Sequence, residues 1–366
     1  MLYLDNASTT KILGEVYDVM SKCLKDVYGN PNSLYYDQAT QAKKLVEQSR
    51  EYVAQMFGTN TKDIVFTGGA TESNNMVIKG IAFKNWERKG HIITSSIEHS
   101  SIIETCKYLE SKGFNVTYLP VNHEGKVDLL DIINNIRSDT ILVSIMWVNN
   151  ETGVINDIDQ ISKVCKKSGV PFHTDATQAV GKMRIDLREL TEVSFISMSA
   201  HKIYGPKGVG CLVVQSNLDK LDPLIHGGEQ ERGLRGGTLS THQIVGLGEA
   251  ARIVNRDLTN NLKILRKSEK KLREHLLKTY GDSVLIHSDI KNKVPGIISV
   301  QFKGINNQLL IKSISDEIAA SSGAACSSSK PSHVLAAMGF SEDIIKETIR
   351  LSLSPYDEYN DFIVFQ

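Results

Sequence analysis

The chain has 366 residues, of which 41% are hydrophobic and 23% charged, and its 42 Lys and Arg side chains balance 42 Asp and Glu side chains. This length exceeds one ordinary hydrophobic core, so we expect two domains, and the composition excludes a disordered or fibrous protein. The balanced charge favours neither nucleic acid nor an anionic membrane, and no apolar run approaches the roughly 18 residues that span a bilayer. The N-terminus MLYLDNASTT has neither a basic start nor an apolar signal core, so we expect a cytoplasmic protein.

Short β-rich runs alternate with amphipathic stretches from residue 63 onward. Most of these runs are apolar on both faces, which is typical of buried parallel strands. The helical stretches between them, such as residues 101–113 and 157–169, end at glycines that suit a C-terminal cap. This alternation predicts a mostly parallel sheet flanked by helices, with ligands beyond the carboxyl ends of its strands. The predicted strands are residues 63–67, 91–95, 115–121, 140–148, 171–176, 194–199 and 210–214.

The pattern changes after about residue 255. A long charged stretch, residues 255–281, precedes shorter strand-like runs at 284–288 and 297–302. This order predicts a second, smaller α+β domain. Its basic run KSEKKLREHLLK has apolar residues on one face, which indicates a solvated helix surface rather than a nucleic-acid patch. We place the large domain at residues 14–257 and the small domain at 1–13 and 258–366.

The five cysteines are widely spaced and include no C-x-x-C pair, which argues against a disulfide framework or a zinc site. Four of them lie among periodic apolar residues and are expected to be small buried hydrophobes. These are Cys23, Cys106, Cys165 and Cys211. Cys326 differs because it lies in AASSGAACSSSKPSH, a run of small polar residues that is typical of a loop. From the residues alone, its thiol is equally an incidental exposed group or a reactive nucleophile.

Polar residues follow two of the predicted strands. GGATESNN follows the strand at 63–67 and opens a helix, so the amides and hydroxyl around Ala70 and Thr71 form a candidate anion-binding cup. Many strand-to-helix turns are glycine-rich for steric reasons, so this signal is weak alone. In TDATQAVGK, Asp175 and Gln178 lie at the end of the strand predicted at 171–176. Asp175 is equally a helix cap or the partner of a protonated pyridine nitrogen.

The segment SMSAHKIYGPKG carries the strongest chemical signal. A strand runs directly into Ser199, His201 and Lys202 and then breaks at a Gly-Pro turn. Lys202 could be a surface charge, and Lys207 competes with it for any role. A serine and a histidine just before a lysine at a strand end nevertheless suit a lysine that forms a Schiff base beside phosphate ligands.

This segment belongs to a set of eight motifs. In chain order the set is YLDNASTT, GGATESNN, EHSS, VNNETG, TDATQAVGK, SMSAHKIYGPKGVG, HGGEQERGLRGGT and SSGAACSSS. Together they resemble the cysteine desulfurases, the NifS/IscS-like branch of the class V aminotransferases, from residue 3 to about residue 355. The resemblance implies the α/β fold of pyridoxal phosphate enzymes of fold type I: a large domain with a mostly parallel sheet flanked by helices, and a smaller α+β domain.

The resemblance also implies a role for each matching residue. Lys202 matches the lysine that holds pyridoxal 5'-phosphate as a Schiff base, and His99 matches the histidine that stacks on the cofactor ring and transfers protons. Asp175 matches the partner of the ring nitrogen, and Gln178 the residue that contacts the phenolic oxygen. Residues that match phosphate-side ligands are Ala70, Thr71, Ser199 and His201.

Three further matches concern the substrate and the partner subunit. Thr238 matches a residue that reaches the phosphate of the neighbouring subunit, which implies a homodimer. Asn150 matches a residue beside the ring and the substrate. Arg350 matches the arginine that binds the substrate carboxylate, a role that suits its planar guanidinium. Without the resemblance, Arg350 would be read as a surface charge and His99 as a satisfied polar histidine.

Cys326 matches the family's nucleophile. The implied reaction converts L-cysteine to L-alanine, leaves the sulfur on Cys326 as a persulfide, and passes it to an acceptor protein. Iron–sulfur cluster assembly, tRNA thiolation and DNA phosphorothioation draw on enzymes of this type. We expect no resident metal, although Cys326 could contact a nascent iron–sulfur cluster. A thiol is only a few per cent ionised at neutral pH, so a reactive Cys326 needs a local cation or a proton acceptor, supplied by His99 or by the surroundings of the cofactor.

Two features depart from the family pattern. The stretch from Cys326 to the PSH sequence is shorter than the usual long form, which puts the reach of Cys326 in doubt. The sequence ends at DFIVFQ, where relatives continue into a final helix, so we expect either a truncated chain or an abbreviated small domain.

Two alternatives stay open. A selenocysteine lyase or another class V enzyme would share the cofactor, although SSGAAC argues against a small-acid aminotransferase. A non-catalytic sulfur-relay scaffold is of a different class, and the presence of Lys202, His99, Asp175 and Cys326 argues against it.

Overall fold

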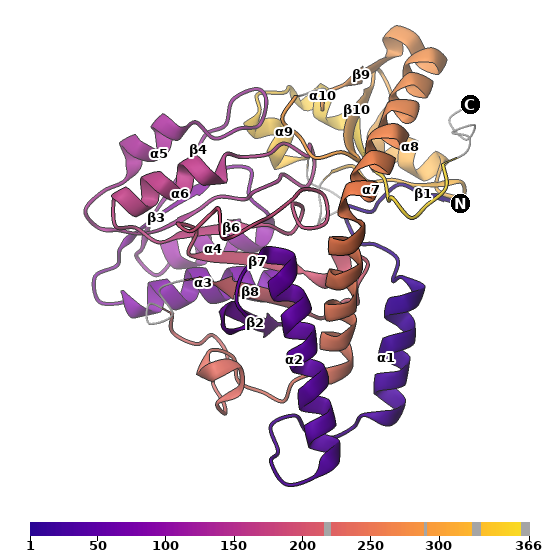
Figure 1. Ribbon diagram of the computed structural model, residues 1–366. Coiled ribbons are helices and arrows are strands. Elements are labelled where there is room, and N and C mark those ends of the chain that lie inside the picture. Colours follow the sequence, from indigo (N-terminus) through magenta and orange to yellow (C-terminus); the bar gives the residue numbers. More distant parts are fainter. Residues whose placement is uncertain (216–220, 289–290, 324–330, 360–366) are drawn as a thin grey trace.

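The computed structural model (Figure 1) describes residues 1–215, 221–288, 291–323 and 331–359. Within these residues the largest sheet has seven strands in the order β2–β8–β7–β6–β5–β3–β4. Neighbouring strands from β7 to β4 are parallel, whereas β8 is antiparallel to both β2 and β7. Each of the seven predicted runs forms one of these strands. They are β2 (Ile64–Thr67), β3 (His91–Ser95), β4 (Asn115–Leu119), β5 (Thr140–Ser144), β6 (Phe172–Asp175), β7 (Phe195–Ser199) and β8 (Gly210–Val214).

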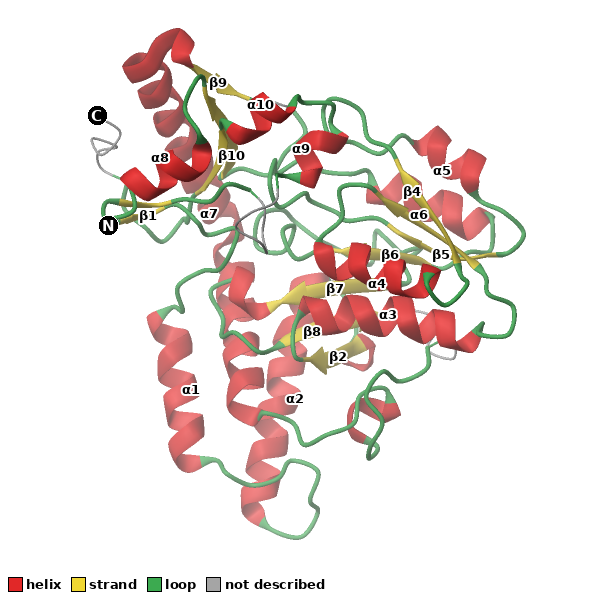
Figure 2. Ribbon diagram, turned by 180° about the vertical axis from the view of Figure 1, so that it is seen from behind, coloured by secondary structure: helices red, strands yellow, loops and turns green. Residues whose placement is uncertain are grey.

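Helices cover both faces of this sheet, as expected for strands that are apolar on both faces. Figure 2 shows α3 (Ala70–Lys84) and α4 (Ser100–Glu110) side by side over one face. The core on the other face includes side chains of α2 (Asp37–Phe57), α6 (Ile158–Lys167) and α1 (Gly14–Asp26). A short helix, α5 (Leu129–Asn135), follows β4. The predicted mostly parallel α/β architecture is therefore confirmed.

The rest of the chain builds smaller sheets. An antiparallel sheet has the order β12–β10–β9, and β1 pairs with β11 in parallel. The predicted strand-like runs at 284–288 and 297–302 contribute β9 and β10. The strands here are β1 (Leu2–Tyr3), β9 (Val284–Ile286), β10 (Ile297–Phe302), β11 (Ile318–Ala319) and β12 (Thr348–Ser352), and the helices are α8 (Asn307–Ser313), α9 (His333–Ala337) and α10 (Glu342–Lys346).

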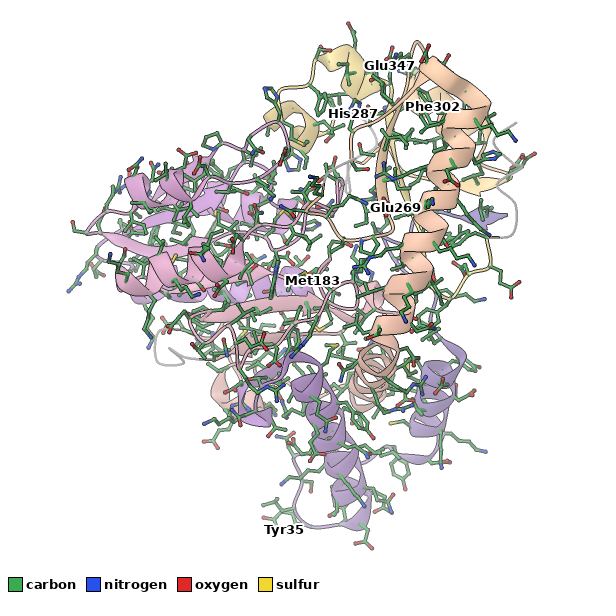
Figure 3. All side chains as sticks on the ribbon, turned by 45° about the horizontal axis from the view of Figure 1, so that its top comes forward. Tyr35, Met183, Glu269, His287, Phe302 and Glu347 are labelled. Atoms are coloured by element: carbon green, nitrogen blue, oxygen red, sulfur yellow. The ribbon has the colours of Figure 1, made fainter. Side chains whose placement is uncertain are left out.

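One helix, α7 (Thr241–Tyr280), contacts both parts of the protein (Figure 1). Its first half contributes Leu247 and Val254 to the core of the seven-stranded sheet, and its second half contributes Leu272 to the core around β10. Figure 3 labels Glu269 on this helix, which accepts hydrogen bonds from Lys293 Nζ at 2.6 Å and from the backbone N–H of Gly296 at 2.7 Å. The helix is thereby tied to the segment before β10.

The start of α7 differs from the sequence interpretation, which began the helical stretch at residue 255. The helix begins at Thr241, and residues such as Ile244 and Ala251 are buried. Because several sides of this first part are covered by α1 and α2, it lacks the one-sided pattern of a surface helix. The predicted domain boundary between residues 257 and 258 falls inside α7.

Four cysteines are buried, as the sequence predicted: Cys23, Cys106, Cys165 and Cys211. Burial raises the pKa of Cys106 and of Cys165 to about 12, so both thiols are protonated at neutral pH. Cys326 lies outside the described residues. Within the ranges given above, no helix combines the length and the apolar character needed to cross a bilayer.

Candidate active site

A cavity of about 700 Å³ lies at the carboxyl ends of β6 and β7, where a parallel sheet is expected to bind ligands. Most of the residues predicted for the site line it. They are Ala70, Thr71, His99, Asn150, Asp175, Gln178, Ser199, His201, Lys202 and Arg350. Thr238 is exposed and does not line the cavity, and the prediction for Cys326 lies outside the described residues.

Lys202 ends the short 3-10 turn that follows β7. Its Nζ donates hydrogen bonds to the backbone carbonyl oxygens of Ala7 at 2.7 Å and Ser8 at 2.6 Å. The competing Lys207 also lines the cavity, but its side chain is exposed. Ala7 and Ser8, in the segment YLDNASTT, therefore form part of the wall of the site. The sequence interpretation quoted this segment as a motif but assigned it no role.

His201 contacts the same segment, through Nδ1 and Thr9 Oγ1 at 3.2 Å. Burial, with help from the charges of Lys202 and Lys207, lowers the pKa of His201 to about 4. The imidazole is therefore neutral at physiological pH and can act as a hydrogen-bond donor to an anion without carrying a charge.

Asp175 is the last residue of β6, and 5% of its surface is exposed. Its Oδ1 accepts the backbone N–H of Thr177 at 3.0 Å, and its Oδ2 accepts Asn74 Nδ2 at 2.8 Å. The two interpretations of Asp175 are thus compatible, because the carboxylate caps the following turn and also lines the cavity. Asn74 also donates to Ser101 Oγ at 2.9 Å. Asn74 lies in the quoted GGATESNN motif, one turn into α3, but the sequence interpretation missed it.

His99 precedes α4 and caps that helix. The Ser101 backbone N–H donates to His99 Nδ1 at 3.2 Å, and Ser101 Oγ lies 2.9 Å from the same nitrogen. Burial is the main cause that lowers the pKa of His99, with a smaller contribution from the charge of Lys202, whereas Asp175 acts in the opposite direction. His99 is therefore neutral at pH 7, and Nε2 is the ring nitrogen that Ser101 leaves for other contacts.

Arg350 lies in the middle of β12, opposite Ser299 of β10, and only 2% of its surface is exposed. Its Nη2 donates to Asp5 Oδ1 at 2.8 Å and to Ser8 Oγ at 2.6 Å, and its Nη1 donates to the Asn150 carbonyl at 3.0 Å. Its Nε is buried without a hydrogen-bond partner among the described residues. A surface charge is therefore excluded, and the guanidinium lines the cavity with unused donor capacity.

The glycine-rich turn before α3 lines the cavity with Gly68 and Gly69. Gly69 has φ of 143°, which favours glycine, and a Cβ there would lie 3.4 Å from Ser199 Oγ. The first amides of α3 have no partner within the helix and point toward its N-terminal end, beside the cavity-lining Thr71 and Ser199. Glu72 accepts Gly68 N–H at 2.8 Å and Arg235 Nε at 3.0 Å. Glu72 and Arg235 are further residues that the sequence interpretation missed.

Two buried carboxyls lie close to the lining residues. Burial raises the pKa of Glu98 to about 8, although Ser95 Oγ and the Met146 N–H donate to its Oε1. Burial also raises the pKa of Glu151, whose Oε2 accepts Ser332 Oγ. Sequence patterns do not identify such groups, because a glutamate beside a polar motif is usually exposed.

Comparisons with known proteins identify the family. The family model described as aminotransferase class-V matches residues 2–363. The cysteine desulfurase IscS of Buchnera aphidicola subsp. Schizaphis graminum is 43% identical over 360 residues, which cover 97% of this chain and 88% of that protein. A solved structure of a NifS-like protein matches this chain with a TM-score of 0.91 at 38% identity. The match covers 98% of this chain and 94% of the NifS-like chain.

A solved structure of SspA in complex with cysteine matches this chain with a TM-score of 0.86 at 39% identity. The match covers 98% of this chain and 100% of the SspA chain. The predicted resemblance to the NifS/IscS-like branch is confirmed by these relatives and by the match along almost the whole chain. The chain belongs to the class V aminotransferase family.

Proposed function

We propose that this protein is a cysteine desulfurase that converts L-cysteine to L-alanine and transfers the sulfur to Cys326 as a persulfide. An acceptor protein then takes the sulfur for iron–sulfur cluster assembly or for thiolation of tRNA or DNA. One observation carries the proposal: Lys202, Asp175, His99 and Arg350 line a single cavity at the carboxyl edge of the sheet. The similarity to a cysteine desulfurase and to a protein bound to cysteine supports the choice of substrate.

The cavity fits pyridoxal 5'-phosphate. Lys202 would hold the aldehyde carbon, and Asp175, whose hydrogen bonds come from the neutral donors Asn74 and Thr177, would hold the protonated ring nitrogen. Gln178 would contact the phenolic oxygen, with His99 and Asn150 beside the ring. The phosphate would bind at the start of α3, with Ala70, Thr71, Ser199 and His201 around it. When bound, the cofactor supplies an electron sink for the bonds at the substrate's α-carbon.

The residues of the chain supply orientation and proton transfer. Arg350 binds the substrate carboxylate. Its guanidinium is buried and charged, and its Nε has no hydrogen-bond partner among the described residues, so it can donate to the carboxylate. The carbonyls of Ala7 and Ser8 hold the Lys202 amine when it is not bonded to the cofactor. His99, neutral because burial lowers its pKa, exchanges protons with the substrate through Nε2.

The described chain on both sides of Cys326 contacts residues next to the cavity. Before it, the backbone of Ser321 pairs with that of Arg350, with hydrogen bonds of 2.6 and 3.2 Å. After it, Ser332 donates to Glu151, and His333 Nε2 lies 2.9 Å from the Glu98 carbonyl. These contacts support the assignment of Cys326 as the nucleophile that takes the sulfur.

We also propose a homodimer in which Thr238 serves the neighbouring subunit. Thr238 is exposed and lies outside the cavity of its own chain, although it belongs to the HGGEQERGLRGGT motif. The motif is anchored by Glu231, whose carboxylate binds both Arg50 Nη1 and Nη2 at 2.9 and 2.8 Å. Such an anchor allows the motif to present Thr238 outward at a defined position.

For the domains, we propose a large domain at residues 14–257 and a small domain at residues 1–13 and 258–366, because separate cores pack on the two halves of α7.

The test combines two substitutions. Lys202→Ala should remove covalently bound pyridoxal phosphate, as read from visible absorbance and from peptide mass after borohydride reduction. Cys326→Ala should keep the cofactor but lower sulfide release from cysteine by at least ~100-fold, because the sulfur has no thiolate acceptor. Sulfide release by Cys326→Ala at the wild-type rate would refute the nucleophile assignment.

Matched controls exist in the chain. Lys207→Ala should retain the covalent cofactor, because the competing lysine is exposed, and Cys23→Ala should retain sulfide release. Alanine release from cysteine and from selenocysteine, measured side by side, distinguishes the desulfurase from a selenocysteine lyase. A protein that binds the cofactor but releases no alanine from either substrate would be a scaffold.

A further inference from the structure

Lys182 has no role in the reaction proposed above, yet its side chain contacts a residue of the site. It lies four residues after Gln178, in the turns that follow β6. Its Nζ donates a hydrogen bond to Gln178 Oε1 at 3.0 Å. On the other side of the same amide, Gln178 Nε2 donates to the Ala7 carbonyl oxygen at 2.8 Å. Gln178 is 3% exposed, so water does not compete freely for these positions.

These two neighbours determine the orientation of the Gln178 amide. The protonated amine of Lys182 can only donate a hydrogen bond, and in either protonation state of Lys182 the backbone carbonyl of Ala7 can only accept one. A flipped amide would place two donors against each other on one side and two acceptors on the other. The carbonyl of Gln178 therefore faces Lys182, and its NH2 group faces Ala7. Because an NH2 group has two protons, one remains available to a ligand in the cavity.

The same contacts connect Lys182 with Lys202. The Ala7 carbonyl accepts Gln178 Nε2 and also Lys202 Nζ at 2.7 Å. Lys182, Gln178, Ala7 and Lys202 thus form a continuous series of hydrogen bonds. Burial, together with the charges of Lys202 and Arg350, lowers the pKa of Lys182 to about 7. Arg350 in turn pairs with Asp5.

We propose that Lys182 is a positioning residue that fixes the Gln178 amide, so that the cavity receives an N–H donor at this point rather than a carbonyl. The ligand group that fits is an anionic oxygen. On the function proposed above, that oxygen is the ionised phenolic oxygen of pyridoxal phosphate. Lys182 would thereby favour the ionised oxygen and lower the proton affinity of the nitrogen that joins Lys202 to the cofactor.

The test uses the protein loaded with pyridoxal phosphate. Lys182→Met keeps most of the side-chain length but removes the donor, and Lys182→Arg restores a donor. In a pH titration of the visible absorbance, Lys182→Met should raise the midpoint by about one pH unit, because the Gln178 N–H is no longer held toward the oxygen. Its affinity for pyridoxal phosphate, measured with apoprotein by fluorescence, should fall about tenfold. Lys182→Arg should lie closer to the wild type in both measurements.

A double-mutant cycle separates positioning from a general effect of charge. In a Gln178→Ala background, Lys182→Met should cause no additional change, because there is no amide left to orient. A shift of the same size in that background would overturn the proposal, as would a wild-type midpoint and affinity for Lys182→Met itself. If Lys182→Met does not fold, Lys182→Leu, which also lacks a donor, takes its place with the same expectations.

A second lysine, Lys293, provides the control. The side chain of Lys293 is 8% exposed, and its Nζ donates to Glu269 near α7, away from the cavity. Lys293→Met should leave the midpoint and the affinity unchanged, and a shift equal to that of Lys182→Met would overturn the proposal. Wild-type protein that binds no pyridoxal phosphate would instead refute the proposed function, so the two failures can be told apart.

Discussion

Glu98 carries a carboxyl group in the interior of the protein. It is fully buried, and its Oε2 has no hydrogen-bond partner among the described residues. Burial raises its pKa from 4.5 to about 8, and the hydrogen bonds from Ser95 and Met146 offset only part of this effect. Glu98 is therefore uncharged at neutral pH, directly beside His99 in the chain.

This proton should make stability depend on pH. Between pH 4.5 and about 8 the unfolded chain releases the proton of Glu98 whereas the folded protein keeps it. The contribution of Glu98 to the free energy of unfolding is thus complete at low pH and decreases as pH rises, by up to about 1.4 kcal/mol per pH unit. Glu98→Gln imitates the protonated carboxyl and should remove this decrease. Urea unfolding at pH 5 and pH 8 measures this effect. The free energy of unfolding of Glu98→Gln, relative to that of the wild type, should be higher at pH 8 than at pH 5.

The exposed Glu124 supplies the control for this measurement. Glu124→Gln should differ from the wild type by the same small amount at both pH values. If Glu98→Gln and wild type keep a constant difference between pH 5 and pH 8, the carboxyl is not protonated in the folded protein.

The sequence predicted most of the residues around the cavity, because motifs at strand ends reveal Lys202, Asp175 and the start of α3. The sequence did not predict that the Ala7 and Ser8 carbonyls accept hydrogen bonds from Lys202. Every residue has a backbone carbonyl, so the residue type does not show which one is used. Asn74 and Lys182 lie inside quoted motifs, but their partners are defined only by the folded chain.

Helices α2 and α7 pack closely because a glycine lies at their contact. A Cβ at Gly248 would lie 2.5 Å from Ser49 Cβ and 2.6 Å from Ser49 Cα, closer than the backbone of α2 allows. Glycine costs about 1 kcal/mol relative to alanine inside a helix, so only packing explains its presence here. Strands were easier to predict than this contact, since apolar character on both faces is visible in sequence and a helix crossing is not.

Gly248→Ala should therefore destabilise the protein by about 1–3 kcal/mol despite its better helix propensity, because α2 and α7 must separate. Gly14→Ala is the matched comparison: Gly14 begins α1, and a Cβ there meets nothing within 4 Å. Gly14→Ala should be neutral or stabilising by up to about 1 kcal/mol. Urea unfolding measures both changes, and equal stabilisation by the two substitutions would show that α2 and α7 tolerate a wider separation.

At the scale of the whole molecule, the proposed homodimer makes each cavity depend on two chains. Thr238→Val alone should weaken pyridoxal phosphate binding about tenfold, because the phosphate loses a hydroxyl donor. In a mixed dimer of Thr238→Val with Lys202→Ala chains, one cavity contains Lys202 from the first chain and Thr238 from the second. Such dimers, made by co-expression with two affinity tags, should regain wild-type affinity in half of their sites. If the affinity for pyridoxal phosphate does not recover in any site, Thr238 does not bind the phosphate in the neighbouring subunit's cavity.

Helix α7 also connects the two parts of the protein. At 1.5 Å per residue, its 40 residues extend for about 60 Å, and both cores are fastened along it. Arg350 lies in β12, and Lys202 lies in the turn after β7, yet both side chains contact Ser8, Arg350 at its Oγ and Lys202 at its backbone carbonyl. A substrate held between these two groups therefore lies where the two cores meet, and the distance between them depends on how α7 holds the cores together.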